Sequence, residues 1–166
     1  MSNNAIIDIA FVCDRGYLMQ TSVAVHTLLE HLSPSMGCRI SVVVPRSSDC
    51  PDVRNWQRRI TSILNDEQNR SLDIIFADET FLSDLHEDDP DSICVATPAA
   101  LLKFKLAELL PNCDKVLYLD GDIVVKGDLA PLWDIDLGTY LVAAVQDSGS
   151  IYWKHEYVQR VHLYFN

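Results

Sequence analysis

Two carboxylates one residue apart, Asp120 and Asp122, are the strongest candidates for chemistry in this chain. They directly follow the apolar run KVLYL, which predicts a buried strand. Because residues two apart in an extended chain point to the same side, both carboxylates can face one cation. Oxygen ligands suit Mg²⁺ or Mn²⁺, and Gly121 between them allows a ligand to approach the backbone. The alternative interpretation is a polar turn that ends a strand.

The pattern Asp-x-Asp alone carries little information in so acidic a chain. With 18 Asp among 166 residues, roughly two such pairs are expected by chance. The chain has three, the others being Asp89/Asp91 and Asp134/Asp136. Only Asp120/Asp122 follows an apolar strand, and in parallel sheets ligands bind at the carboxyl ends of the strands. This context singles out Asp120/Asp122 as the metal-site candidate.

A second candidate site is the stretch IAFVCDRGY at residues 9–17. An apolar strand ends there, and Asp14 opens the loop before the first expected helix. At this place in an α/β sheet, Asp14 can accept hydrogen bonds from a ribose and Tyr17 can offer its ring to a base. The alternative is an N-cap followed by a turn. Asp147 follows an apolar VAAV run in a similar way.

Strand and helix patterns alternate along the chain. Strands are expected at residues 6–13, 39–44, 72–77, 115–119 and 140–145, and helices at 21–32, 52–69 and 97–110. This alternation predicts an α/β fold with a mainly parallel sheet and helices on both faces. The carboxyl ends of its strands would carry both candidate sites.

Composition excludes several partners. The chain has 13 Lys and Arg against 24 Asp and Glu, a net charge of −11, so we expect no nucleic-acid partner, which would need clustered cations. No apolar stretch approaches the ~20 residues that cross a bilayer, so we expect no transmembrane segment. Five cysteines without a CxxC pair fit a reducing cytosol. Seven acids fall in residues 78–92, which we interpret as a solvated loop or a lid over a site.

The chain resembles the family 8 glycosyltransferases, the group of the glycogenins and the bacterial lipopolysaccharide galactosyl- and glucosyltransferases. The resemblance lies in DIAFVCDRGYLMQTSVAVHTLLEH, in LLKFKLAELLPNCDKVLYLDGDIVVKGDLAPLWDIDLG, in AAVQD and in the final YFN. It implies a Rossmann-like GT-A fold, UDP-glucose or UDP-galactose as donor, and Mn²⁺ or Mg²⁺. It further implies transfer, with retention of anomeric configuration, to a saccharide or glycolipid acceptor such as that of lipopolysaccharide biosynthesis.

The resemblance also implies roles for individual residues. Asp120 and Asp122 would bind the metal, with Gly121 beside the donor. Lys103 stands where the bacterial members have an Arg that reaches the diphosphate or donor sugar. Asp147 and Asn166 would be catalytic residues on the donor-sugar or acceptor side. The remaining positions would hold the uracil and ribose, and they are Val12, Cys13, Asp14, Arg15, Gly16 and Tyr17.

Family members continue past the position of Asn166 into a His-x-x-Gly-x-x-Lys-Pro-Trp-like segment that supplies a third metal ligand. We therefore expect residues 1–166 to form one incomplete GT-A domain, truncated at the C-terminus. The resemblance places it in the cytoplasm, or peripheral to the inner membrane. It leaves room for an oligomer formed through the C-terminal end, and we expect weak or no transfer by the chain itself.

Two other interpretations stay open on sequence alone. The stretch LYLDGDIVV has the form of the haloacid-dehalogenase phosphatase motif, with Asp120 as nucleophile and Asp122 as acid/base. Against it, that motif usually opens a chain, and here it lies deep within one. The other interpretation is a catalytically silent UDP-sugar-binding or interaction module.

Overall fold

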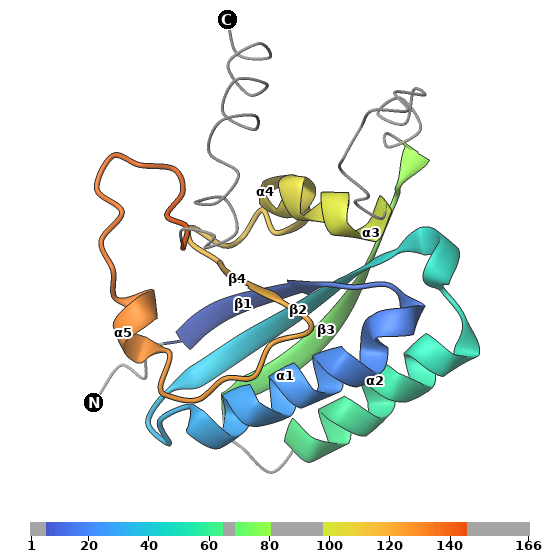
Figure 1. Cartoon of the computed structure of the whole chain (residues 1–166), viewed down its shortest axis with the longest axis horizontal. Coiled ribbons are helices and arrows are strands. Elements are labelled where there is room, and N and C mark those ends of the chain that lie inside the picture. Colours follow the sequence, from blue (N-terminus) through green and yellow to red (C-terminus); the bar gives the residue numbers. More distant parts are fainter. Residues whose placement is uncertain (1–5, 65–68, 81–97, 146–166) are drawn as a thin grey trace, which may run out of the picture. The chain divides into compact units, whose positions relative to one another are not determined.

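The computed structural model of the chain describes residues 6–64, 69–80 and 98–145. Four parallel strands form one sheet in the order β3-β2-β1-β4 (Figure 1). They are β1 (Ile6–Val12), β2 (Gly37–Pro45), β3 (Arg70–Ala77) and β4 (Leu117–Asp120). The prediction of an α/β fold with a mainly parallel sheet is confirmed.

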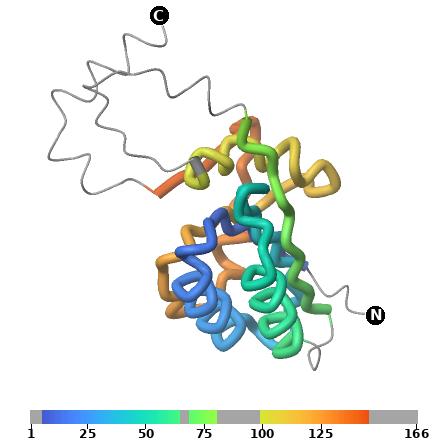
Figure 2. The backbone as a smooth tube through the Cα atoms, turned by 90° about the vertical axis from the view of Figure 1, so that its right-hand side faces the viewer, coloured from blue at the N-terminus to red at the C-terminus, as the bar shows by residue number. Residues whose placement is uncertain are grey.

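Helices cover both faces of this sheet (Figures 1 and 2). The two long ones, α1 (Leu18–His31) and α2 (Pro51–Leu64), share one face. Short helices between β3 and β4 lie on the other face, and they are α3 (Pro98–Leu101), η4 (Leu102–Lys105) and α4 (Leu106–Leu109). The remaining short helices are η1 (Arg15–Tyr17), η2 (Arg46–Ser48) and α5 (Ala130–Trp133).

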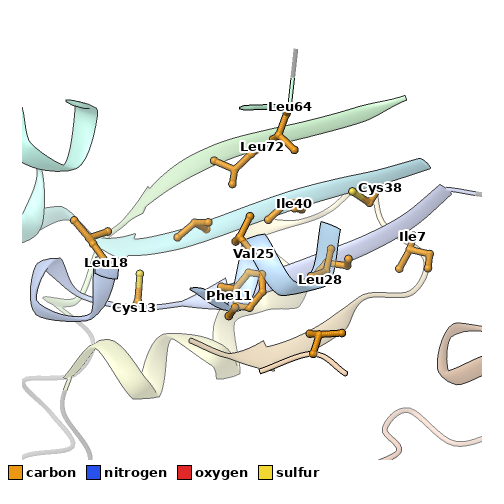
Figure 3. Packing of buried hydrophobic residues seen from close by; sticks show 14 of the residues in the cluster. Ile7, Phe11, Cys13, Leu18, Val25, Leu28, Cys38, Ile40, Leu64 and Leu72 are labelled. Carbon is orange, nitrogen blue, oxygen red and sulfur yellow. The ribbon is translucent and has the colours of Figure 1, made fainter. Parts of the chain in front are cut away.

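The alternation of side chains along β1 builds a core on each face. Ile7, Ile9 and Phe11 pack in the core under α1 and α2, where Figure 3 shows Phe11 near Leu28. Ala10 and Val12 point to the opposite face, toward η4 and α4. Successive residues of a strand face opposite sides, so a strand buried on both faces is mainly apolar. The one acid of β1, Asp8, is buried and paired with Arg39 of β2. Each fully buried large side chain stabilises the fold by about 1.5–3 kcal/mol.

Three of the expected elements differ from the structure. The helix expected at residues 52–69 is α2 (Pro51–Leu64), and Asn69 lies in a turn. The helix expected at residues 97–110 is broken into α3, η4 and α4, the middle piece being a 3₁₀ turn, and Thr97 lies outside the described residues. The strand expected at residues 140–145 is wrong, because these residues form no strand and the side chains of Leu141 and Val145 are 95% and 92% exposed. An apolar run becomes a strand only where a partner satisfies its backbone, and no described strand pairs with this one.

The chain divides into two compact units, Met1–Asp134 and Ile135–Asn166. The first contains the sheet and all the helices named above. In the second, Asp136 Oδ1 accepts a hydrogen bond from Gly138 N at 2.8 Å, and Gly138 has a φ of 55° that suits glycine. The expectation of one incomplete domain over residues 1–166 stays a prediction. Within the described ranges, no helix is long and apolar enough to cross a membrane.

Candidate functional site

The two candidate sites meet at one edge of the sheet. In the parallel pairing of β1 with β4, Val12 lies opposite Asp120, so both strands end side by side. The chain leaves β1 toward β2 and β3 on one side and returns to add β4 on the other. This reversal between β1 and β4 is a topological switch point, the place where open α/β sheets bind ligands.

At the end of β4, both carboxylates are available to a ligand. Asp120 and Asp122 are exposed, whereas Gly121 between them is buried. A Cβ added at Gly121 would lie 2.6 Å from Thr21 Oγ1 of α1, so the packing of α1 against this turn favours glycine here. The expected approach of a ligand to Gly121 stays a prediction.

Asp120 is the last residue of β4, and Asp122 lies in the turn that follows, so the expected extended spacing does not reach Asp122 and the polar turn of the alternative interpretation is present. Carboxylate oxygens are still the ligands that a hard divalent cation prefers. Mg²⁺ and Mn²⁺ commonly bind through one or two carboxylates and complete their ligands with substrate phosphates and water. Within residues 6–64, 69–80 and 98–145, no group of three or more His, Cys, Asp or Glu residues could hold a metal ion. The candidate metal ligands therefore stay the two carboxylates that the sequence indicates, Asp120 and Asp122.

Tyr118 and Lys103 adjoin this pair. The Tyr118 hydroxyl donates a hydrogen bond to Asp120 Oδ1 at 2.7 Å. Burial, with the hydrogen bond to Asp120 second, raises the pKa of Tyr118 well above its usual value, so the phenol remains a donor across the neutral range. The Lys103 ammonium lies 5.9 Å from the centroid of the Tyr118 ring, within cation–π range. Tyr118 therefore contacts the Asp120 carboxylate through its hydroxyl and has the Lys103 ammonium over its ring.

At the end of β1, two of the residues expected to bind the nucleotide-sugar donor, Val12 and Cys13, have buried side chains. Val12 packs against η4 and α4, and Cys13 packs in the core beside α1. Burial raises the pKa of the Cys13 thiol to about 11, opposed by a hydrogen bond with Thr21, while the nearby Asp14 carboxylate raises it further. The thiol is therefore neutral near pH 7, and only the backbone of these residues is open to a donor.

The loop after β1 exposes the other expected donor contacts. Asp14 Oδ1 accepts a hydrogen bond from Gly16 N at 2.7 Å and caps η1, as the N-cap alternative predicted. Among the residues that the structure describes, the second oxygen of Asp14 has no hydrogen-bond partner and can accept from a further N–H or O–H group. Tyr17 is 47% exposed. Arg15 forms an exposed ion pair with Asp52 of α2, so its guanidinium is directed toward that helix.

Several expectations fall outside this site. Asp147, Asn166 and most of the acidic segment 78–92 lie outside the described residues. Of that segment, Glu79 is described, and its carboxylate accepts hydrogen bonds from the backbone N–H groups of Arg46 and Ser47. A shallow depression of about 400 Å³ lies along α2 beside Arg58 and Arg59, far from the ends of β1 and β4. It does not contribute to the candidate site.

A sequence model of the group described as Glycosyl transferase family 8 matches residues 8–164. The chain belongs to glycosyl transferase family 8. Members of this family generally use a nucleotide-sugar donor and a divalent metal ion. Membership in family 8 favours neither the phosphatase nor the silent-module interpretation.

Similar proteins agree with family 8. The chain is 43% identical over 88 residues to probable galacturonosyltransferase 14 of Arabidopsis thaliana. This matched segment covers 52% of this chain and 16% of that protein. The apo structure of the bifunctional glycosyltransferase WbbM superposes with a TM-score of 0.65 at 21% identity, over 87% of this chain and 23% of the other. Apo GlyE of Streptococcus pneumoniae TIGR4 gives 0.63 at 23% identity, over 87% and 30%. These structures show the GT-A fold, and the chain spans a small part of each of these proteins.

Two residues of the site were not anticipated from the sequence. Tyr118 stands two residues before Asp120 on the same strand, a spacing that places both on one face, and this signal was available. Thr21 comes from α1, and its contact with Gly121 depends on how α1 packs beside β4. No local pattern marks that contact.

Proposed function

We propose that the chain carries the donor-binding part of a metal-dependent retaining glycosyltransferase, which moves glucose or galactose from a UDP-sugar to a saccharide or glycolipid acceptor. The observation that carries this proposal is the pairing of Val12 with Asp120 at the switch point of the sheet. It brings the loop of Asp14 and Tyr17 to the same edge as Asp120 and Asp122. One edge thus offers groups for a nucleoside and groups for a metal-bound diphosphate.

Asp120 and Asp122 would hold Mn²⁺ or Mg²⁺. When bound, the cation supplies Lewis-acid stabilisation of the negative charge on the departing diphosphate. The exposure of both side chains leaves them open to a donor that brings its own phosphate oxygens. An acidic protein needs such a cation to hold an anionic diphosphate beside two carboxylates.

The loop after β1 would bind the nucleoside. The half-exposed Tyr17 ring can stack on uracil, and the free oxygen of Asp14 can accept from a ribose hydroxyl. Val12 and Cys13 would contribute backbone only, because their side chains are buried. Lys103 supplies positive charge near the diphosphate, as a single ammonium without the fork of an Arg.

The reaction exchanges one bond at the anomeric carbon of the donor sugar. The bond from this carbon to the phosphate oxygen breaks, and its electron pair leaves with UDP. The acceptor hydroxyl oxygen forms the new bond and loses its proton to a base. Asp147 and Asn166 are the proposed side chains on the donor-sugar or acceptor side, and the sugar carbon carries oxocarbenium-like charge, as in glycoside hydrolysis.

The family resemblance supports a proposal for the acceptor and the cellular location. We propose a saccharide or glycolipid acceptor of the lipopolysaccharide kind, and a location in the cytoplasm or, for the full-length protein, at the periphery of the inner membrane. Because the Arabidopsis relative is named a galacturonosyltransferase, UDP-galacturonic acid should be tested as a donor beside UDP-glucose and UDP-galactose.

Calorimetric titration of UDP, with and without Mn²⁺, tests this function. We expect binding that depends on Mn²⁺ and is lost in Asp120→Asn/Asp122→Asn. The matched control is Asp134→Asn/Asp136→Asn, which removes the same charge at the same spacing from another pair in the chain. Metal-independent UDP binding that survives Asp120→Asn/Asp122→Asn would refute the metal site.

A further inference from the structure

Tyr118 has no role in the function proposed above, although it contacts the first carboxylate of the pair. It lies on β4, its ring is half-buried against the core of Val12 and Leu102, and its hydroxyl donates to Asp120 Oδ1 at 2.7 Å. Both residues lie on the same face of β4, because they are two apart in a strand. The hydrogen bond is therefore built into the strand itself.

This hydrogen bond gives Asp120 a fixed orientation that its surroundings do not otherwise provide. Asp120 is exposed, so core packing does not hold its carboxylate. Within the described part of the chain, no other hydrogen bond or ion pair to this carboxylate is found. An unrestrained carboxylate loses rotational freedom on binding a ligand, and that loss weakens binding. A carboxylate already held by a phenol avoids much of this loss.

The ring of Tyr118 also contacts Lys103. The Lys103 ammonium lies 5.9 Å from the centroid of the Tyr118 ring and 5.8 Å from that of Phe104. Since Phe104 is 76% exposed, the half-buried Tyr118 ring is the better anchored of the two. One side chain thus touches both a carboxylate and a cation of the proposed donor site.

We infer that Tyr118 is a positioning residue of the Asp120/Asp122 site, whose hydroxyl occupies Oδ1 of Asp120 and directs Oδ2 toward a divalent cation. This inference rests on the proposed function. Carboxylates that ligate metals are commonly held by such hydrogen bonds, and loss of the partner weakens metal affinity 10–100-fold. The aromatic ring of Tyr118 has a second role that can be tested separately, which is to position the Lys103 ammonium beside the diphosphate.

The test is the affinity of the full chain for Mn²⁺ alone, measured from the electron paramagnetic resonance signal of free Mn²⁺. Tyr118→Phe keeps the ring and removes the hydroxyl, and we expect it to weaken Mn²⁺ binding about 10–100-fold. Tyr140→Phe is the matched control, because it removes the hydroxyl of another tyrosine, one that is 78% exposed and has no role in the proposed function; we expect no change. Circular dichroism and the urea midpoint show whether each variant is folded.

A second measurement separates positioning from a general loss of structure. Mn²⁺ binding should perturb the near-ultraviolet absorption of a tyrosine in the wild type and in Tyr140→Phe, but not in Tyr118→Phe. Tyr118→Leu should bind Mn²⁺ as weakly as Tyr118→Phe does. It should bind UDP–Mn²⁺ less tightly than Tyr118→Phe, because it also removes the aromatic ring that positions Lys103.

The possible results distinguish this inference from the proposed function. If Tyr118→Phe binds Mn²⁺ as tightly as the wild type while Asp120→Asn/Asp122→Asn does not bind it, the positioning role is refuted and the metal site stands. If the wild type itself binds neither Mn²⁺ nor UDP–Mn²⁺, both proposals are refuted together.

Discussion

Replacing Gly121 by alanine should destabilise the protein, although the change adds a single methyl group. The new Cβ would lie 2.6 Å from Thr21 Oγ1, a distance that real Cβ atoms do not tolerate. Thr21 cannot easily yield, because it is fully buried and its hydroxyl donates to Tyr17 O at 2.9 Å. Either the turn after β4 or the start of α1 must move.

The cost follows from the size of the overlap. Forcing one extra carbon into a packed site costs about 1–3 kcal/mol. Against this, alanine lowers the entropy of the unfolded chain and returns about 0.4–1 kcal/mol. With a urea dependence of roughly 2 kcal/mol per molar, a net loss of about 1–2 kcal/mol lowers the unfolding midpoint by about 0.5–1 M.

The matched control for this prediction is Gly127→Ala. A Cβ at Gly127 meets nothing within 4 Å, so only the unfolded-state gain applies and the urea midpoint should hold or rise slightly. Urea unfolding followed by circular dichroism measures both variants under the same conditions.

A rescue variant tests the cause. Thr21→Ala removes Oγ1, and the remaining contact, from the new Cβ to that of residue 21, is an ordinary 3.6 Å. We therefore expect Gly121→Ala to cost less in a Thr21→Ala background than in the wild type. Equal midpoints for Gly121→Ala and Gly127→Ala, or equal costs in both backgrounds, would show that the contact does not constrain the turn.

Two further predictions concern the same region and its core. Thr27→Val should lower the unfolding free energy, measured by urea unfolding, by about 1–3 kcal/mol. The reason is that the Thr27 hydroxyl accepts a hydrogen bond from Val125 N at 3.1 Å, and valine leaves that N–H unpaired. An unchanged unfolding free energy would contradict this prediction. Burial raises the pKa of Cys13 and of Cys38 from 9.0 to about 11, so the folded state keeps protons that the unfolded state releases, and unfolding free energy should fall as pH rises from about 9 to about 11. Cys13→Ala/Cys38→Ala should flatten that fall, and an equally steep loss in this variant would assign it to other groups.

The strands were predictable because their sequences are largely apolar. β1 and β2 are buried along most of their length and β3 contains the apolar residues 74–77, so each stands out as a short apolar run. The parallel sheet follows from the helices between them. The Asp120/Asp122 pair was predictable for the same reason, since it ends such a run. The break in the helix after residue 97 was not, because Leu102 and Leu106 keep helical spacing through the 3₁₀ turn.

Contacts between distant segments were the other limit. The run at residues 140–145 is as apolar as a strand, but an apolar run does not specify a partner. The contact of Thr21 with Gly121 joins segments a hundred residues apart and depends on the crossing of α1 over the end of β4. The hydrogen bond from Tyr118 to Asp120 was within reach, since it needs only the two-residue repeat of a strand.

Among the described strands, β4, which ends at Asp120, comes last along the chain and has the least pairing. β4 aligns with β1 over four residues, whereas β1 and β2 align over seven. A short edge strand opens at a smaller free-energy cost than the central strands, and its contact with β1 must close a long loop of chain. We therefore expect amide hydrogens of β4 to exchange sooner than those of β1 and β2, and donor binding to slow their exchange. The loop after β1 and the carboxylates at the end of β4 would then belong to two segments of different local stability. A bound nucleotide-sugar donor would contact both segments and so stabilise their pairing.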